Sequence, residues 1–126
     1  MSVRLLRVAE VTEADRAALL ELQSSVFSPE EVANWPGRHL EWSKHDWRVC
    51  VYAPGGALVT HVGVVIREGT HDGRSARIGG IGAVMTHPEA RRQGHAERGI
   101  HRAIELFRDE QVRFGLLVCK PTLLDY

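Results

Sequence analysis

The chain has 126 residues, of which 44% are hydrophobic and 25% charged, and its 16 Lys and Arg balance 16 Asp and Glu. This length is typical of one small domain with its own core, so we expect residues 1–126 to form a single domain. A net charge of zero argues against a general binder of nucleic acids or membrane surfaces, since such proteins carry excess basic charge. No apolar run is long enough to span a bilayer.

The N-terminal residues and the cysteines both indicate a cytoplasmic protein. Residues 1–10 contain arginines and no uninterrupted apolar run, so no secretory signal is visible. Cys50 and Cys119 stand in apolar, strand-like stretches without CxxC spacing. We expect both to be buried free thiols in a reducing compartment rather than a disulfide.

The first quarter of the chain predicts a strand followed by helices. Residues 2–8 (SVRLLRV) read as a strand. Thr12 can cap the next helix, with Asp15 reaching back in a capping box. One face of that helix is apolar and carries Leu19, Leu22 and Val26. Ser28-Pro29 predicts a short helix within an otherwise irregular segment.

Three strands in a meander are predicted next. Residues 48–53 and 57–67 are strand-like, and the Pro54-Gly55-Gly56 segment between them is typical of a hairpin. Asp72-Gly73 is a second turn, which leads into a strand over residues 74–86. The pattern predicts an antiparallel sheet.

The last third of the chain predicts a helix and a final strand. Residues 94–108 place apolar side chains on one helical stripe, made of Ala96, Ile100, Ala103, Ile104 and Phe107. Residues 112–119 (VRFGLLVC) are apolar on both faces, which favours a strand buried at the centre of a sheet.

The loop before that helix, "THPEARRQGHA" at residues 86–96, has the features of an anion site. The first N–H groups of a helix lack internal partners, and its dipole is positive at that end. Gly94 would allow close approach to the backbone, and Arg91 and Arg92 add charge suited to phosphate oxygens. A phosphate is therefore a natural occupant. The alternative is a solvated loop with an arginine-rich helix start.

The stretch "VMTHPEARRQGHA" resembles the acetyl-CoA loop of the GCN5-related N-acetyltransferase (GNAT) superfamily. In that family a strand ending in V-x-x-x-P precedes Q/R-x-x-G-x-G/A at a helix start, and Pro88 with residues 91–96 reproduces the pattern. The order of elements over residues 3–126 is also similar. The resemblance implies an α/β fold with a mixed, mostly antiparallel sheet flanked by helices, without the family's usual last strand pair.

The resemblance further implies acetyl-CoA as cosubstrate, with an acetyl group transferred by direct attack of an amine. The pantetheine arm would pair with the backbone of Val84, Met85 and Thr86, and an N–H near the first two would bind the oxyanion. The pyrophosphate would lie on the loop formed by Arg91, Arg92, Gln93, Gly94, His95 and Ala96.

The catalytic groups depart from the family pattern. Many relatives carry an acidic base six residues before the proline, where this chain has Gly82 and no ionisable neighbour in residues 78–85. His87 and His95 are the nearest titratable candidates for a base. The resemblance places a thiolate-protonating tyrosine close to Tyr126, which we take as the candidate general acid.

The resemblance to small-amine acetyltransferases, including aminoglycoside 2′-N-acetyltransferases, implies a small-molecule primary amine as acceptor. Residues 28–47 also contain a cluster of tryptophans and histidines, namely Trp35, His39, Trp42, His45 and Trp47. These side chains would either line the acceptor site or form a small core that covers the sheet edge. His61 reads as a satisfied structural residue, and the histidine spacing gives no support for a metal site.

Two alternatives to catalysis remain at this point. The chain could bind CoA with little or no activity, which Gly82 and the short C-terminus favour, or it could be a structural module that inherited the fold. An apolar strand without its neighbouring strand pair also predicts a homodimer through residues 112–126, because unpaired apolar edges invite pairing.

Overall fold

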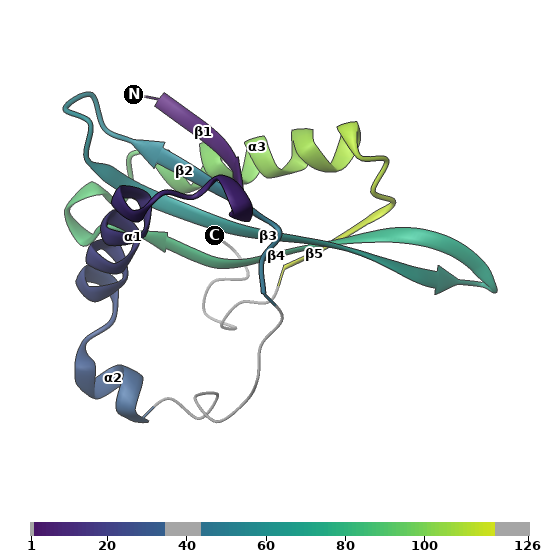
Figure 1. Cartoon of the computed structure of the whole chain (residues 1–126), viewed down its shortest axis with the longest axis horizontal. Helices are drawn as coiled ribbons and strands as arrows, with labels where there is room; N and C mark the ends of the chain where they lie inside the picture. The colour runs from purple at the N-terminus through teal and green to yellow at the C-terminus, as the bar shows by residue number, and fades with distance from the viewer. Residues whose placement is uncertain (1, 35–43, 118–126) are drawn as a thin grey trace.

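The computed structural model describes residues 2–34 and 44–117, and its centre is a five-stranded sheet (Figure 1). The strands follow one another in chain order across the sheet: β1 (Ser2–Arg7), β2 (Trp47–Tyr52), β3 (Leu58–His71), β4 (Arg74–Thr86) and β5 (Phe114–Leu117). The first four strands are antiparallel, and β5 runs parallel to β4. The predicted α/β fold, with a mixed and mostly antiparallel sheet flanked by helices, is confirmed.

The helices begin where the sequence predicts them. They are α1 (Glu13–Val26), α2 (Pro29–Asn34) and α3 (His95–Asp109), with short 3-10 turns η1 (Val8–Glu10) and η3 (Pro88–Ala90). Thr12 caps α1, since its hydroxyl accepts from the Asp15 N–H at 3.2 Å and its own N–H donates to the Asp15 carboxylate at 3.0 Å. This reciprocal capping box satisfies two backbone donors that the helix itself cannot.

Both predicted turns are present and set the length of the meander. The Ala53 N–H donates to the Ala57 carbonyl at 2.9 Å and closes the first hairpin. Asp72 (φ 51°) and Gly73 (φ 77°) both adopt the left-handed conformation that a two-residue hairpin of this type requires. The β3–β4 hairpin is long and extends beyond the rest of the sheet (Figure 1).

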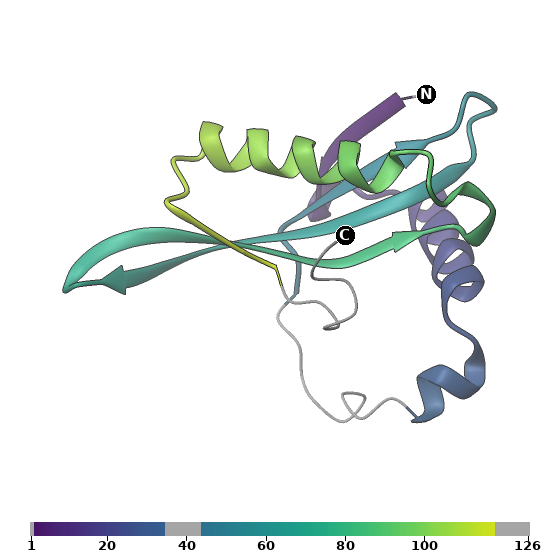
Figure 2. The same ribbon diagram turned by 180° about the vertical axis from the view of Figure 1, so that it is seen from behind.

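Helices α1 and α3 lie on opposite faces of the sheet (Figures 1 and 2). The main core lies under α3 and consists of Val49, Val62, Val64, Ala103, Leu106 and Phe107. Ile104 was expected on this buried stripe but is 39% exposed, whereas Leu106 is 3% exposed. One residue corresponds to about 100° of rotation, so the position directly after Ala103 turns away from the sheet.

The prediction for β5 is wrong in one respect. Residues 112–119 were expected to form a strand buried on both faces, yet Leu116 and Leu117 are 61% and 51% exposed. Within residues 2–34 and 44–117, β5 pairs with β4 alone, over Ile78 to Ile81, and forms an edge of the sheet. Its apolar composition therefore does not reflect burial among the described elements.

Candidate functional site

A cavity of about 420 Å³ lies where β4 ends and α3 begins. It is lined by Thr86, Ala90, Arg91, Arg92, Gly94, His95, Ala96 and Glu97. Six of these eight are among the nine residues that the sequence assigns to cofactor binding. The segment predicted to hold an anion therefore lines a concave surface rather than a flat loop.

Internal hydrogen bonds give the loop around this cavity its shape. The His87 Nδ1 atom accepts from the Glu89 N–H at 3.1 Å and caps η3. The Arg91 Nε–H donates to the Thr86 carbonyl at 3.3 Å, which ties the loop to the end of β4. The His95 ring, which is buried, lies 3.3 Å from Gln93 Oε1. In these hydrogen bonds His87 and His95 hold the loop together. Neither bond reaches Gly82, the position beside which a catalytic base was expected.

The start of α3 presents backbone N–H groups and positive charge to the cavity. Arg92 (φ 63°) and Gly94 (φ 78°) both adopt left-handed conformations, and this turns the chain into the helix. The Arg98 N–H donates to the Gly94 carbonyl at 3.1 Å, so the Ala96 and Glu97 N–H groups belong to the first turn, for which the helix itself offers no acceptors. A Cβ at Gly94 would meet no atom within 4 Å. The loop therefore leaves open space where an anion can approach the backbone.

Strand β4 is irregular just before this loop. His61 pairs with Met85 and Gly63 pairs with Gly82, so β4 has one more residue than β3 between these pairs. The extra residue produces a bulge in which Ala83 has a positive φ of 49°. Gly82, Met85 and Thr86 pair with β3 on one side, and no described strand pairs with residues 82–86 on the other. The predicted pantetheine-binding residues thus lie on an open strand edge, with Val84 exposed and Met85 buried.

His61 supports the bulge from the neighbouring strand. The residue is fully buried, and its Nδ1 lies 2.8 Å from the Ala83 carbonyl while its Nε2 lies 3.0 Å from Arg48 Nη1. A carbonyl can only accept and a guanidinium can only donate, so Nδ1 carries the hydrogen and the ring is neutral. Burial lowers the pKa of His61 to about 4, and the Arg48 charge acts in the same direction. The prediction that His61 is a satisfied structural residue is confirmed.

The depressed pKa of His61 predicts that acid destabilises the fold. Between pH 6.5 and about 4 the unfolded chain binds a proton at this histidine and the native state does not, so stability falls as the pH falls. The full loss is about 3 kcal/mol. Urea unfolding of the wild type and His61→Gln at pH 7 and pH 4.5 measures it, and the variant should lose less stability between the two. Parallel losses in both proteins would contradict the prediction.

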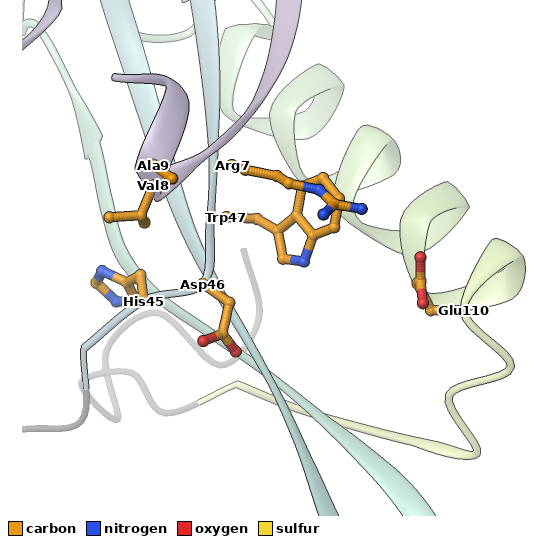
Figure 3. Close-up of a pocket in the computed structure, with 7 residues that line it drawn as sticks. All are labelled: Arg7, Val8, Ala9, His45, Asp46, Trp47 and Glu110. Atoms are coloured by element: carbon orange, nitrogen blue, oxygen red, sulfur yellow. The ribbon is translucent and has the colours of Figure 1, made fainter. Parts of the chain in front are cut away.

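A second, shallower hollow lies at the start of β2 (Figure 3). It is lined by Arg7, Val8, Ala9, His45, Asp46, Trp47 and Glu110. Most of its charged groups are already engaged. The Arg7 guanidinium lies 4.8 Å from the centre of the Trp47 ring, Asp46 pairs with Arg67, and Glu110 pairs with Arg77. His45 lies apart from these, beside Val8 (Figure 3).

Several predicted residues cannot be placed in the site. Tyr126, Cys119, Trp35, His39 and Trp42 lie outside the described residues. Of the aromatic cluster, Trp47 packs against the core under α3, and His45 lies on the opposite face, over Gly63. Cys50 is a buried free thiol, as expected.

The described residues contain neither a membrane-spanning helix nor a metal-binding cluster. No helix in residues 2–34 and 44–117 is long and apolar enough to cross a membrane. In the same residues, no group of three or more His, Cys, Asp or Glu side chains is placed to hold a metal ion.

Comparison with known families gives one match over most of the chain. The family profile described as "Acetyltransferase (GNAT) domain" matches residues 7–121. No curated protein matches the sequence.

Several solved structures with the same fold are acetyltransferases of low sequence identity. A Trypanosoma brucei acetyltransferase is 22% identical with a TM-score of 0.67, and the match covers 98% of this chain and 87% of that one. The aminoglycoside 6'-N-acetyltransferase AAC(6')-Ig of Acinetobacter haemolyticus is 18% identical with a TM-score of 0.67, over 99% and 83%. The aminoglycoside N-acetyltransferase AAC(6')-Iy, bound to the bisubstrate analogue CoA-S-monomethyl-acetylneamine, is 13% identical with a TM-score of 0.66, over 98% and 83%.

Proposed function

The chain belongs to the GNAT acetyltransferase family, and from this premise we propose that it transfers an acetyl group from acetyl-CoA to a primary amine of a small molecule. The observation that carries the proposal is the cavity at the start of α3, which adjoins the open edge of β4. A turn suited to an anion and a strand edge with no neighbour among the described strands meet at one place, and a pyrophosphate joined to an amide-containing arm requires these two surfaces.

The chemistry of the residues present suits acetyl-CoA. Arg91 and Arg92 supply guanidinium groups at the cavity, and the N–H groups of the turn from Gln93 to Ala96 would hold the pyrophosphate. Residues Val84, Met85 and Thr86 would pair with the amides of the pantetheine arm. When bound, acetyl-CoA supplies a thioester carbonyl that an amine can attack directly, and a β4 N–H near Val84 or Met85 would stabilise the oxyanion.

The acceptor is proposed by class only. Two structural neighbours are named for aminoglycosides and a third is a glucosamine-6-phosphate N-acetyltransferase of Arabidopsis thaliana. Aminoglycosides and amino sugars are therefore the first amines to examine. We place the reaction in the cytoplasm, where acetyl-CoA and free thiols coexist.

The test measures thiol release from acetyl-CoA with neamine, glucosamine 6-phosphate and spermidine as acceptors. Release that depends on the amine supports the proposal. The competing proposal, a CoA-binding protein with little or no catalysis, is favoured by the absence of any ionisable side chain in residues 78–85 of β4. Stabilisation by acetyl-CoA without thiol release would support that second function, and no stabilisation at all would contradict both.

Tyr126 is proposed as the general acid that protonates the leaving thiolate. Its replacement by phenylalanine removes the proton but keeps the ring, so Tyr126→Phe should lower turnover by about 10²–10⁴-fold. The affinity for CoA should change little, because Tyr126 is not among residues 91–96, which are proposed to hold the pyrophosphate. Steady-state kinetics with matched CoA titrations measure both. Unchanged turnover would exclude Tyr126 and indicate that water protonates the thiolate.

We also propose a homodimer formed through residues 112–126. The described part of this segment includes β5, where Phe114, Leu116 and Leu117 are all at least one-third exposed. Pairing with a second chain would cover apolar surface worth about 25 cal/mol per Å². Light scattering should show a dimer for the wild type and a monomer for Leu117→Asp. A stable wild-type monomer would contradict this proposal.

A further inference from the structure

A pair of glycines on neighbouring strands leaves a hollow on the face of the sheet opposite α3. Gly63 of β3 and Gly82 of β4 are register partners across the antiparallel ladder. A Cβ at Gly63 would lie 2.5 Å from His45 Nε2 and 2.6 Å from His45 Cε1. A Cβ atom never lies this close to a non-bonded atom in real structures. The imidazole therefore occupies this space only because position 63 has no side chain.

The same imidazole lies where a side chain at position 82 would point. A Cβ at Gly82 would be 3.7 Å from His45 Nε2, which is ordinary van der Waals contact. Position 82 lies within residues 78–85 of β4, which carry no ionisable side chain. His45 therefore brings a titratable group from a different part of the sequence into that place.

The backbone next to His45 is held firmly. The Asp46 N–H donates to the Val64 carbonyl at 2.8 Å, and the Asp46 carbonyl accepts from the Val8 N–H at 3.0 Å. The Asp46 carboxylate accepts from the Ile66 N–H at 2.9 Å and pairs with Arg67. These contacts fix the residue after His45 against both β3 and η1. The position of the imidazole follows from the fold rather than from a free surface rotamer.

The imidazole is available for proton transfer. It is half-buried, and among the described residues its ring lies edge-on to the His61 ring. Burial lowers the pKa of His45 below its usual value of 6.5, and the Arg48 charge on β2 adds to this while Asp46 opposes it. The His61 ring, 6.3 Å away, is neutral, and β4 has no ionisable group at this point. At neutral pH the imidazole of His45 is therefore unprotonated and can accept a proton.

We propose that His45 is the general base of the acetyl transfer, an inference that rests on the proposed function. Under that function the thioester carbonyl would lie against β4 near Val84, two residues beyond Gly82 and just past the bulge at Ala83. The attacking amine would lie between the carbonyl and the imidazole and would give its proton to His45 directly or through one water molecule.

The proton balance of the step is simple. The substrate ammonium gives one proton to His45 Nε2, and its freed lone pair forms the N–C bond to the carbonyl carbon. Collapse of the tetrahedral intermediate breaks the C–S bond, and the second proton lost from nitrogen ends on the CoA thiol. His45 then releases its proton to solvent, so that each turnover yields the amide, the thiol and one free proton.

The first test is His45→Gln, which keeps a polar side chain of similar size but cannot titrate. With the amine that the wild type turns over fastest, we expect kcat to fall by about 10²–10⁴-fold. The inflection below pH 6.5 in the kcat/KM profile should disappear, while stabilisation by acetyl-CoA stays. His101→Gln, an exposed histidine of α3, is the matched control and should retain wild-type kinetics.

The second test restores a base at the same place. Gly82 does not have a positive φ, so glutamate is conformationally allowed there. The double variant His45→Ala/Gly82→Glu should recover at least tenfold in kcat over His45→Ala. Loss in His45→Gln followed by this rescue supports the inference. Wild-type kinetics and an unchanged pH profile in His45→Gln would overturn it and leave the proposed function standing. A wild type that releases no thiol with any amine would overturn both.

Discussion

Gly94→Glu is expected to abolish the binding of acetyl-CoA. A ligand present at a hundredfold excess over its Kd stabilises the wild type by about 2.7 kcal/mol. In the variant a carboxylate stands in the open space beside the first turn of α3, where the pyrophosphate would bind. Like charge and added volume oppose the ligand together. Thermal unfolding with and without acetyl-CoA should therefore show no stabilisation in the variant at the same concentration.

Gly73→Glu provides the matched control for this experiment. Both glycines have a left-handed backbone, with φ of 77° at Gly73 and 78° at Gly94, and neither would place a Cβ within 4 Å of another atom. The two variants should therefore lose similar stability, about 1–2 kcal/mol, from backbone strain. Only Gly94 adjoins the cavity, since Gly73 lies in the β3–β4 turn. Equal stabilisation of Gly94→Glu and Gly73→Glu by acetyl-CoA would show that the α3 turn does not bind the pyrophosphate.

Local signals in the sequence predicted most of the fold. Thr12 and Asp15 define a capping box within four residues, and Asp72-Gly73 defines a hairpin turn within two. The bounds of β4 were predicted to the residue, since a turn precedes the strand and a proline follows it. The site loop at residues 91–96 was also local, because a helix start and its basic residues are adjacent in sequence. Its assignment to the pyrophosphate stays a prediction.

Long-range relationships could not be read from the sequence in the same way. The bulge at Ala83 depends on the register of β4 against β3, and hydrophobic periodicity does not determine that register to one residue. His45 is 37 positions before Gly82, so no sequence motif joins them. In the sequence it also appears only as one member of an aromatic cluster. The exposure of β5 was missed because an apolar composition does not reveal how many strands pair with a segment.

A similar pair of glycines makes room for an aromatic ring on the α3 face of the sheet. Gly79 of β4 and Gly115 of β5 are register partners, and the Phe107 ring of α3 packs over both. A Cβ at Gly79 would lie 2.5 Å from Phe107 Cε1, and one at Gly115 would lie 3.5 Å from Cε2. Glycines on adjacent strands thus leave room for one ring on each face of the sheet, His45 on one face and Phe107 on the other. On β4, the Phe107 ring excludes a Cβ at Gly79, whereas a Cβ at Gly82 would only touch His45 at 3.7 Å.

Phe107→Ala is therefore expected to cost about 3–5 kcal/mol in the free energy of unfolding, the usual range for a buried phenylalanine. The side chain is 7% exposed and closes the core over β4 and β5. Because β5 is joined to the described sheet over only four residue pairs, its amide protons should also exchange faster in the variant. Urea unfolding and hydrogen exchange measure the two effects, and a cost below 1 kcal/mol would contradict the prediction.

Gly79→Ala tests whether the glycine and the ring depend on each other. In the wild type the added methyl group would overlap the Phe107 ring, and overpacking of this kind costs about 1–3 kcal/mol. In the Phe107→Ala background the same methyl group enters space that the ring has left, so Gly79→Ala should cost less or stabilise. The coupling energy in this double-mutant cycle should then reach about 0.5–3 kcal/mol. Additive costs would show that the Phe107 ring does not require glycine at position 79, and would contradict this account of its packing.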